Sequence, residues 1–116
     1  LSYVYIHLEA PDESGHQGSL SDKIKSIELI DSLVLKPVYE YLKDCGEEFG
    51  ILIMPDHPTP LSIRTHSSDP VPFLYCKSTD DVKYPERVFS EKEAEKTGIY
   101  ENYAHILTDK ILKGLI

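Results

Sequence analysis

Two short apolar runs separated by a long helical pattern constrain this fold more than any other feature. Residues 2–8 (SYVYIHL) and 49–54 (FGILIM) have the β-branched, aromatic and aliphatic content that is typical of strands buried on both faces. Between them, apolar side chains recur with helical spacing from Leu20 to Tyr41. Because this connection is too long for a hairpin, it predicts a right-handed crossover between parallel strands. We therefore expect an α/β fold with three layers and a mostly parallel sheet.

The ends of the long helical pattern are marked by residues with known local preferences. Ser19 and Asp22 are spaced like a capping box at the start of the helix. Pro37 lies inside the pattern, where it removes a backbone donor and costs about 3 kcal/mol relative to alanine, so we expect the helix to kink or restart there. Cys45 and Gly46 then close it.

The second half of the chain predicts one more strand and two helices. A third strand is expected at residues 71–76, after a proline-rich loop. Ser90 is placed to cap a short helix that Gly98 can terminate, and a final helix is expected at residues 102–113. The polar stretch 78–87 is the expected flexible connection.

Composition narrows the functional classes. The chain has 116 residues, which is one domain at most, and a formal net charge of −8 that argues against a nucleic-acid surface. It has no apolar stretch long enough to span a membrane, and its first residues do not form a signal peptide. Its two cysteines lack metal-binding spacing, as expected of reduced thiols. These features predict a cytoplasmic protein that binds neither nucleic acid nor membrane.

Acidic and histidine side chains follow both predicted central strands. Asp12 and His16 come after the first strand, Asp56 and His57 come after the second, and His66 lies nine residues further along the same loop. Because the carboxyl ends of parallel strands share one edge of a sheet, we expect the five side chains to converge there.

Two carboxylates and three imidazoles without a cysteine suit Mn²⁺ or Zn²⁺. Five ligands exceed what one catalytic ion usually takes, whereas two ions about 3.5–4 Å apart would use them all to hold a phosphoryl group. Each residue also has a simpler interpretation. His16, for example, is close to Gly15 and Gly18 and is compatible with a solvated turn.

Three segments also resemble a known family. "APDESGHQG", "PDHPTP" and "RTHSSDPVPF", in this order and spacing, are similar to signature segments of the cofactor-independent (2,3-bisphosphoglycerate-independent) phosphoglycerate mutases. The similarity is to their archaeal-type branch, within the alkaline phosphatase superfamily. It covers nearly the whole chain but only the C-terminal part of such an enzyme. The resemblance thus implies that residues 1–116 are the C-terminal part of a metal-binding catalytic domain with an alkaline-phosphatase-like fold.

The resemblance implies a division of the ligands between two divalent metal ions, Mn²⁺ or Zn²⁺ with Mg²⁺ as an alternative. One ion would take Asp12, His16 and His66, and the other would take Asp56 and His57. The implied reaction is the glycolytic interconversion of 3-phosphoglycerate and 2-phosphoglycerate through a phosphoserine intermediate. Such an enzyme is an isomerase whose substrate is a phosphorylated three-carbon acid.

Parts of the family pattern have no counterpart in this chain. The nucleophilic serine, a further aspartate ligand and the arginine-rich substrate cap come from the N-terminal part of the family. We therefore expect this chain to be inactive alone and to need that N-terminal part as its partner. Arg64 is a candidate substrate-binding residue because it lies two residues before His66, although a surface role is an alternative.

Other functions remain open at this point. A phosphohydrolase or a phosphotransferase of the same superfamily, for example one acting on homoserine, would use the same metals. A non-enzymatic metal-binding module is the further alternative. Product analysis separates the first two from the mutase, and the measured metal content decides the third.

Overall fold

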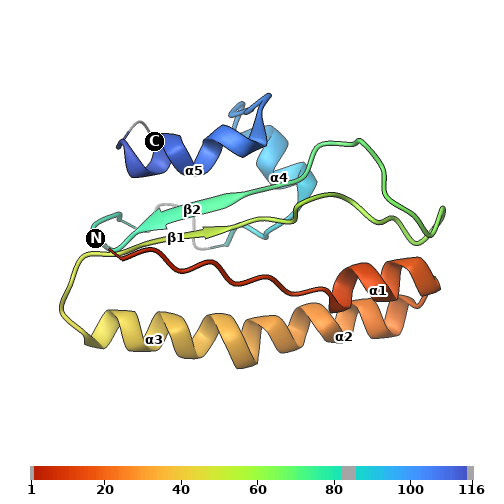
Figure 1. Cartoon of the computed structure of the whole chain (residues 1–116), viewed down its shortest axis with the longest axis horizontal. Helices are drawn as coiled ribbons and strands as arrows, with labels where there is room; N and C mark the ends of the chain where they lie inside the picture. The colour runs from red at the N-terminus through yellow and green to blue at the C-terminus, as the bar shows by residue number, and fades with distance from the viewer. Residues whose placement is uncertain (1, 82–85, 115–116) are drawn as a thin grey trace.

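The computed structural model describes residues 2–81 and 86–114, which form a small α/β unit. A long helical run lies on one side of two paired strands, and two shorter helices lie on the other side (Figure 1). The elements in chain order are α1 (Ala10–Gln17), α2 (Leu20–Ile30), η1 (Asp31–Leu35), α3 (Lys36–Asp44), β1 (Gly50–Ile53), β2 (Leu74–Lys77), α4 (Glu91–Lys96), η2 (Ala104–Ile106) and α5 (Leu107–Leu112).

The sheet of the described residues is a two-stranded antiparallel pair. Strand β1 falls within the predicted run 49–54, and β2 overlaps the predicted run 71–76. Ile51 lies opposite Cys76, and Leu52 lies opposite Tyr75. The α/β class is confirmed. The two strands of the described residues are antiparallel, so they do not confirm the three-layer arrangement with a mostly parallel sheet, which stays a prediction.

The prediction of a strand at residues 2–8 is wrong for this structure. The segment runs without helix or strand assignment up to α1, in the same direction as β1 in Figure 1. A strand requires a partner backbone, and the sheet formed by the described residues contains only β1 and β2. The apolar side chains of this segment are correspondingly open to solvent, with Val4 78% exposed and Tyr5 71% exposed.

The long helical run begins and bends where the sequence predicts. The Ser19 side chain accepts a hydrogen bond from the Asp22 amide at 3.4 Å, which confirms the N-cap of α2. The run then widens into the π-helical turn η1, and α3 restarts with Pro37 in its first turn. A wider turn just before a proline accommodates its missing donor and its ring, which explains the predicted break. Cys45 caps α3, as expected.

The C-terminal helices also follow their predicted boundaries. The Ser90 side chain caps α4 by accepting from the Glu93 amide at 3.3 Å, and Gly98 adopts a left-handed φ of 70° just after that helix. The final helix comprises η2 and α5, within the predicted range 102–113. The predicted flexible connection 78–87 lies partly outside the described residues.

Little of the apolar surface is covered. Among the described residues, Leu107 is the one large hydrophobic side chain that is fully buried, at 1% exposure. Apolar side chains of the long helical run remain open, including Leu20 at 59% and Leu33 at 68% exposure. Within residues 2–81 and 86–114, no helix has the length and apolar character needed to cross a membrane.

Candidate metal centre

Helix α1 places Asp12 and His16 on one face. The two residues are four apart, so their side chains are neighbours one turn apart. Pro11 in the first turn favours this short helix, and Gly18 ends it with a left-handed φ of 68°. The sequence analysis predicted no helix here, although the proline, the glycine and the spacing are signals of one.

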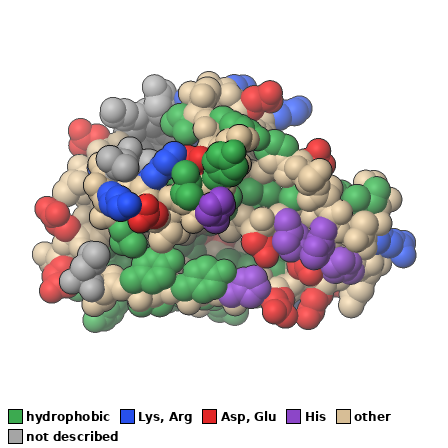
Figure 2. All heavy atoms as spheres, turned by 45° about the horizontal axis from the view of Figure 1, so that its top comes forward, with side chains coloured by type: hydrophobic (Ala, Val, Ile, Leu, Met, Phe, Trp, Pro, Cys, Tyr) green, Lys and Arg blue, Asp and Glu red, His purple; other side chains and the backbone are tan. Residues whose placement is uncertain are grey.

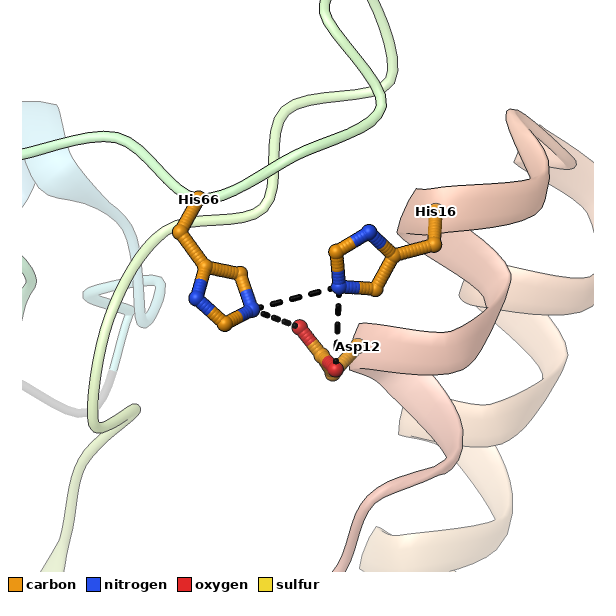
Figure 3. Close-up of side chains that lie close together, drawn as sticks. All are labelled: Asp12, His16 and His66. Atoms are coloured by element: carbon orange, nitrogen blue, oxygen red, sulfur yellow. Dashed lines mark hydrogen bonds and ion pairs between the residues drawn. The ribbon is translucent and has the colours of Figure 1, made fainter.

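A histidine from the loop after β1 completes a group of three potential ligands. The Nε2 atom of His66 lies 3.0 Å from Oδ1 of Asp12 and 3.2 Å from Nε2 of His16. The third side of the triangle joins Nε2 of His16 to Oδ2 of Asp12 at 3.4 Å. All three side chains point toward one another, as Figure 3 shows. We call Asp12, His16 and His66 the triad.

The triad fits a small divalent cation. Tetrahedral coordination with bonds of about 2.0–2.1 Å places ligand atoms about 3.3–3.4 Å apart, close to the separations in the triad. Two imidazole nitrogens that face each other beside a carboxylate also form a donor set that suits Zn²⁺ or Mn²⁺. The three side chains are 35–50% exposed, so the group is open to solvent and to further ligands.

One protein group orients each of two triad members. The ring Nδ1 of His16 lies 2.9 Å from the carbonyl oxygen of Arg64. A carbonyl can only accept, so this contact places a proton on Nδ1 and leaves the lone pair on Nε2, inside the triad. The hydroxyl of Thr59 donates to Oδ1 of Asp12 at 2.6 Å.

These contacts favour the anionic form of Asp12. The hydrogen bond from Thr59 lowers the pKa of the Asp12 carboxyl below its ordinary value. Partial burial of the carboxyl opposes that shift, and the neighbouring His16 and His66 lower the pKa further. Asp12 is therefore available as a carboxylate ligand over the physiological pH range.

The other two predicted ligands lie beside the triad. The ring of His57 is tilted against that of His66, with centroids 3.6 Å apart. Asp56 is more exposed, and its Oδ2 lies 3.4 Å from Nε2 of His57. Figure 2 shows histidine side chains gathered next to acidic ones on this face. In the described part of the chain, Asp56 and His57 do not join the group of three whose ligand atoms all lie within 4.8 Å of one another.

Arg64 contributes through both its backbone and its side chain. It has a φ of 52°, the left-handed region that is uncommon for residues other than glycine. Its guanidinium lies over Gly18, with Nε 2.4 Å from the position that a Cβ on Gly18 would take. The sequence singled out Arg64 for substrate binding but did not indicate that its carbonyl contacts His16.

The sequence analysis did not identify Thr59 and Lys23 as residues of the site. Thr59 is buried at 5% exposure, and Gly15 packs directly against it. The Nζ of Lys23 in α2 donates to the carbonyl oxygen of Thr59 at 2.6 Å. A threonine between two ligand segments was the available signal, but its contact with Asp12 depends on tertiary packing.

Comparison with known proteins gives consistent matches. The chain is 44% identical over 93 residues to a 2,3-bisphosphoglycerate-independent phosphoglycerate mutase of Methanosarcina barkeri, covering 80% of this chain and 23% of that protein. It is 54% identical over 75 residues to a protein of the same name from Methanothrix thermoacetophila, covering 65% of this chain and 19% of the relative. No solved structure gives a significant match.

The chain thus spans about a fifth to a quarter of these relatives. The family model described as "Metalloenzyme superfamily" matches residues 1–113, which is nearly the whole sequence. This chain therefore belongs to the metalloenzyme superfamily.

Proposed function

We propose that this chain is the metal-binding C-terminal part of a cofactor-independent phosphoglycerate mutase. The observation that supports the proposal most is the triad, whose donor atoms meet at 3.0–3.4 Å although His66 comes from a segment far from α1 in the sequence. The family resemblance assigns these same three residues to one metal. The names of the relatives supply the reaction class.

In this proposal the ligands divide between two divalent ions, Mn²⁺ or Zn²⁺. Asp12, His16 and His66 hold one ion, while Asp56 and His57 offer two ligands to the other. The chemistry that bound ions supply is neutralisation of phosphate charge and a lowered pKa for an attacking hydroxyl. The chain itself orients the donors, since the carbonyl of Arg64 fixes the tautomer of His16.

The substrate of the proposed enzyme is a phosphorylated three-carbon acid. A chain with a net charge of −8 repels such an anion unless cations reverse the local field. Ions bound by the two ligand sets would supply that reversal, and the exposed guanidinium of Arg64 is a further candidate contact. Its place over Gly18, at the end of α1, keeps it near the helix that bears Asp12 and His16.

The proposed partner of this chain is the N-terminal part of the same enzyme. That part would supply the serine nucleophile, an additional metal ligand and the substrate cap. The open apolar side chains of residues 2–8 and of the long helical run support this arrangement, because one fully buried large hydrophobic side chain among the described residues is too small a core. The same contacts would complete an alkaline-phosphatase-like sheet around β1.

A chimera tests the proposed function. The segment of the Methanosarcina barkeri relative that matches this chain is replaced by residues 1–116, and conversion of 3-phosphoglycerate is followed by ³¹P NMR. We expect the chimera to form 2-phosphoglycerate in the presence of Mn²⁺ or Zn²⁺. The isolated chain and a chimera with His66→Ala should form none.

Several results would contradict the proposal. A folded, metal-loaded chimera that releases phosphate or phosphorylates homoserine would point to a sister activity of the superfamily. A folded chimera that binds no metal would contradict both the mutase reaction and the sister activities. Turnover by the isolated chain, with its mass verified, would mean that the nucleophile lies within these residues.

A further inference from the structure

We propose that Thr59 is a positioning residue of the metal centre, whose hydroxyl fixes Asp12 for coordination and links the two ligand segments. The inference rests on the proposed metal-binding role of the triad. It concerns a residue that contacts the ligands rather than the metal.

The hydroxyl of Thr59 lies between ligands of both proposed sites. It donates to Oδ1 of Asp12 at 2.6 Å, and its oxygen lies 3.4 Å from Nδ1 of His57. An ionised carboxylate only accepts, so the direction of the first hydrogen bond is fixed. A hydrogen bond to a charged acceptor is among the stronger ones in proteins, and it restricts the orientation of the Asp12 carboxylate.

Thr59 is itself held from two other directions. Its carbonyl oxygen accepts a hydrogen bond from Nζ of Lys23 at 2.6 Å. A Cβ on Gly15 would lie 2.6 Å from that carbonyl oxygen and 2.8 Å from Cγ2 of Thr59, so the residue fits closely against the backbone of α1. With 5% of its surface exposed, Thr59 is much more buried than the ligands that it contacts. A side chain held in this way can fix a more exposed carboxylate.

This arrangement makes Asp12 the point at which α1 meets the loop between β1 and β2. Oδ1 faces both Thr59 and His66, whereas Oδ2 faces His16. Without the hydroxyl, the carboxylate can rotate about its side-chain torsions, and the separations of 3.0–3.4 Å within the triad are no longer enforced. Groups that orient metal ligands typically change metal affinity about 10- to 100-fold when they are removed.

The test compares Thr59→Val, which removes the hydroxyl, with Thr59→Ser, which keeps it. Zn²⁺ and Mn²⁺ are titrated calorimetrically into the 116-residue chain and into the chimera described above, so that a variant that fails to fold alone still gives an affinity. Thr79→Val, at an exposed threonine in the turn after β2, is the matched control.

We expect Thr59→Val to weaken binding by about 10- to 100-fold and Thr59→Ser to bind like the wild type. The Ser variant separates a positioning role from simple packing, because it loses the methyl group but retains the donor. Equal affinities for wild type and Thr59→Val would overturn this inference and leave the proposed function intact. An equal loss in Thr59→Ser would also overturn it, by assigning the effect to packing. Absence of binding by the wild type in both contexts would overturn the proposed function and this inference with it.

Discussion

Replacement of Gly15 by alanine should disturb the metal centre through Thr59, against which Gly15 packs. Gly15 lies in α1 and is buried against Thr59. An added Cβ would lie 2.6 Å from the carbonyl oxygen of Thr59, 2.8 Å from its Cγ2 and 3.0 Å from its Cβ. Real Cβ atoms do not approach backbone oxygen this closely, so either α1 or the loop that contains Thr59 must move.

The net effect can be worked out from three contributions. Overpacking of a close contact costs about 1–3 kcal/mol. Alanine gains about 1 kcal/mol over glycine inside a helix. Movement of Thr59 away from Asp12 loses a hydrogen bond to a charged acceptor, for which we take the lower end of about 1.5 kcal/mol because Asp12 is about one-third exposed. We expect a net loss of about 2.5 kcal/mol, the middle of a range of about 1.5–3.5 kcal/mol, which is roughly a 60-fold change in the ratio of folded to unfolded protein.

Urea denaturation followed by circular dichroism measures the stability, and calorimetry measures metal affinity in the same samples. Gly46→Ala is the control, because Gly46 has a φ of 75° and no neighbour within 4 Å. That change should cost about 1 kcal/mol of backbone strain and leave metal affinity unaltered. If Gly15→Ala were as stable as the wild type and bound metal equally well, the packing of Thr59 against α1 would not position the ligands.

Three other predictions concern the triad and one ion pair. His66→Ala should lower the affinity for Zn²⁺ or Mn²⁺, measured by calorimetry, by at least about 10- to 100-fold. Ser14→Ala should have little effect, because the Ser14 hydroxyl donates a hydrogen bond to the carbonyl oxygen of Ala10 and not to a metal ligand. Metal binding by the wild type should weaken on acidification, since protons compete for the imidazole ligands, and a pH series of the same titration would refute this if affinity stayed constant. Hydrogen bonding to Lys110 lowers the pKa of Glu101. This pair should therefore stabilise the fold above the ordinary glutamate pKa, and its contribution should be lost as the pH falls through the lowered value. Unfolding curves of Lys110→Met should accordingly show a smaller loss of stability on acidification than those of the wild type.

Local sequence signals specified most element boundaries correctly. The cap at Ser19, the break before Pro37 and the turn at Gly98 are set by side chains and backbone preferences within a few residues, so they could be predicted without knowledge of the fold. The short helix α1 was not predicted. Its sequence signals are Pro11 in the first turn and Gly18 directly after the last helical residue.

The predicted strand at residues 2–8 shows that a pattern of apolar residues is not enough to establish a strand. An apolar run indicates that a segment prefers an extended, buried environment, but a strand forms only where another backbone supplies hydrogen bonds. The described residues provide no such partner for this run. Whether it pairs depends on contacts beyond the segment itself, which no local pattern encodes.

Residue types alone were enough to identify the side chains that could serve as metal ligands, because imidazole and carboxylate chemistry is a property of the residues. The sequence also indicated the family, since three spaced segments were enough for the resemblance. Tertiary packing was needed to bring Asp12, His16 and His66 to separations of 3.0–3.4 Å, and to place the hydroxyl of Thr59 against Asp12 and the carbonyl of Arg64 against His16. The physical reason is that such contacts join α1 to a loop about fifty residues away, and distances between separate segments are set by packing rather than by composition.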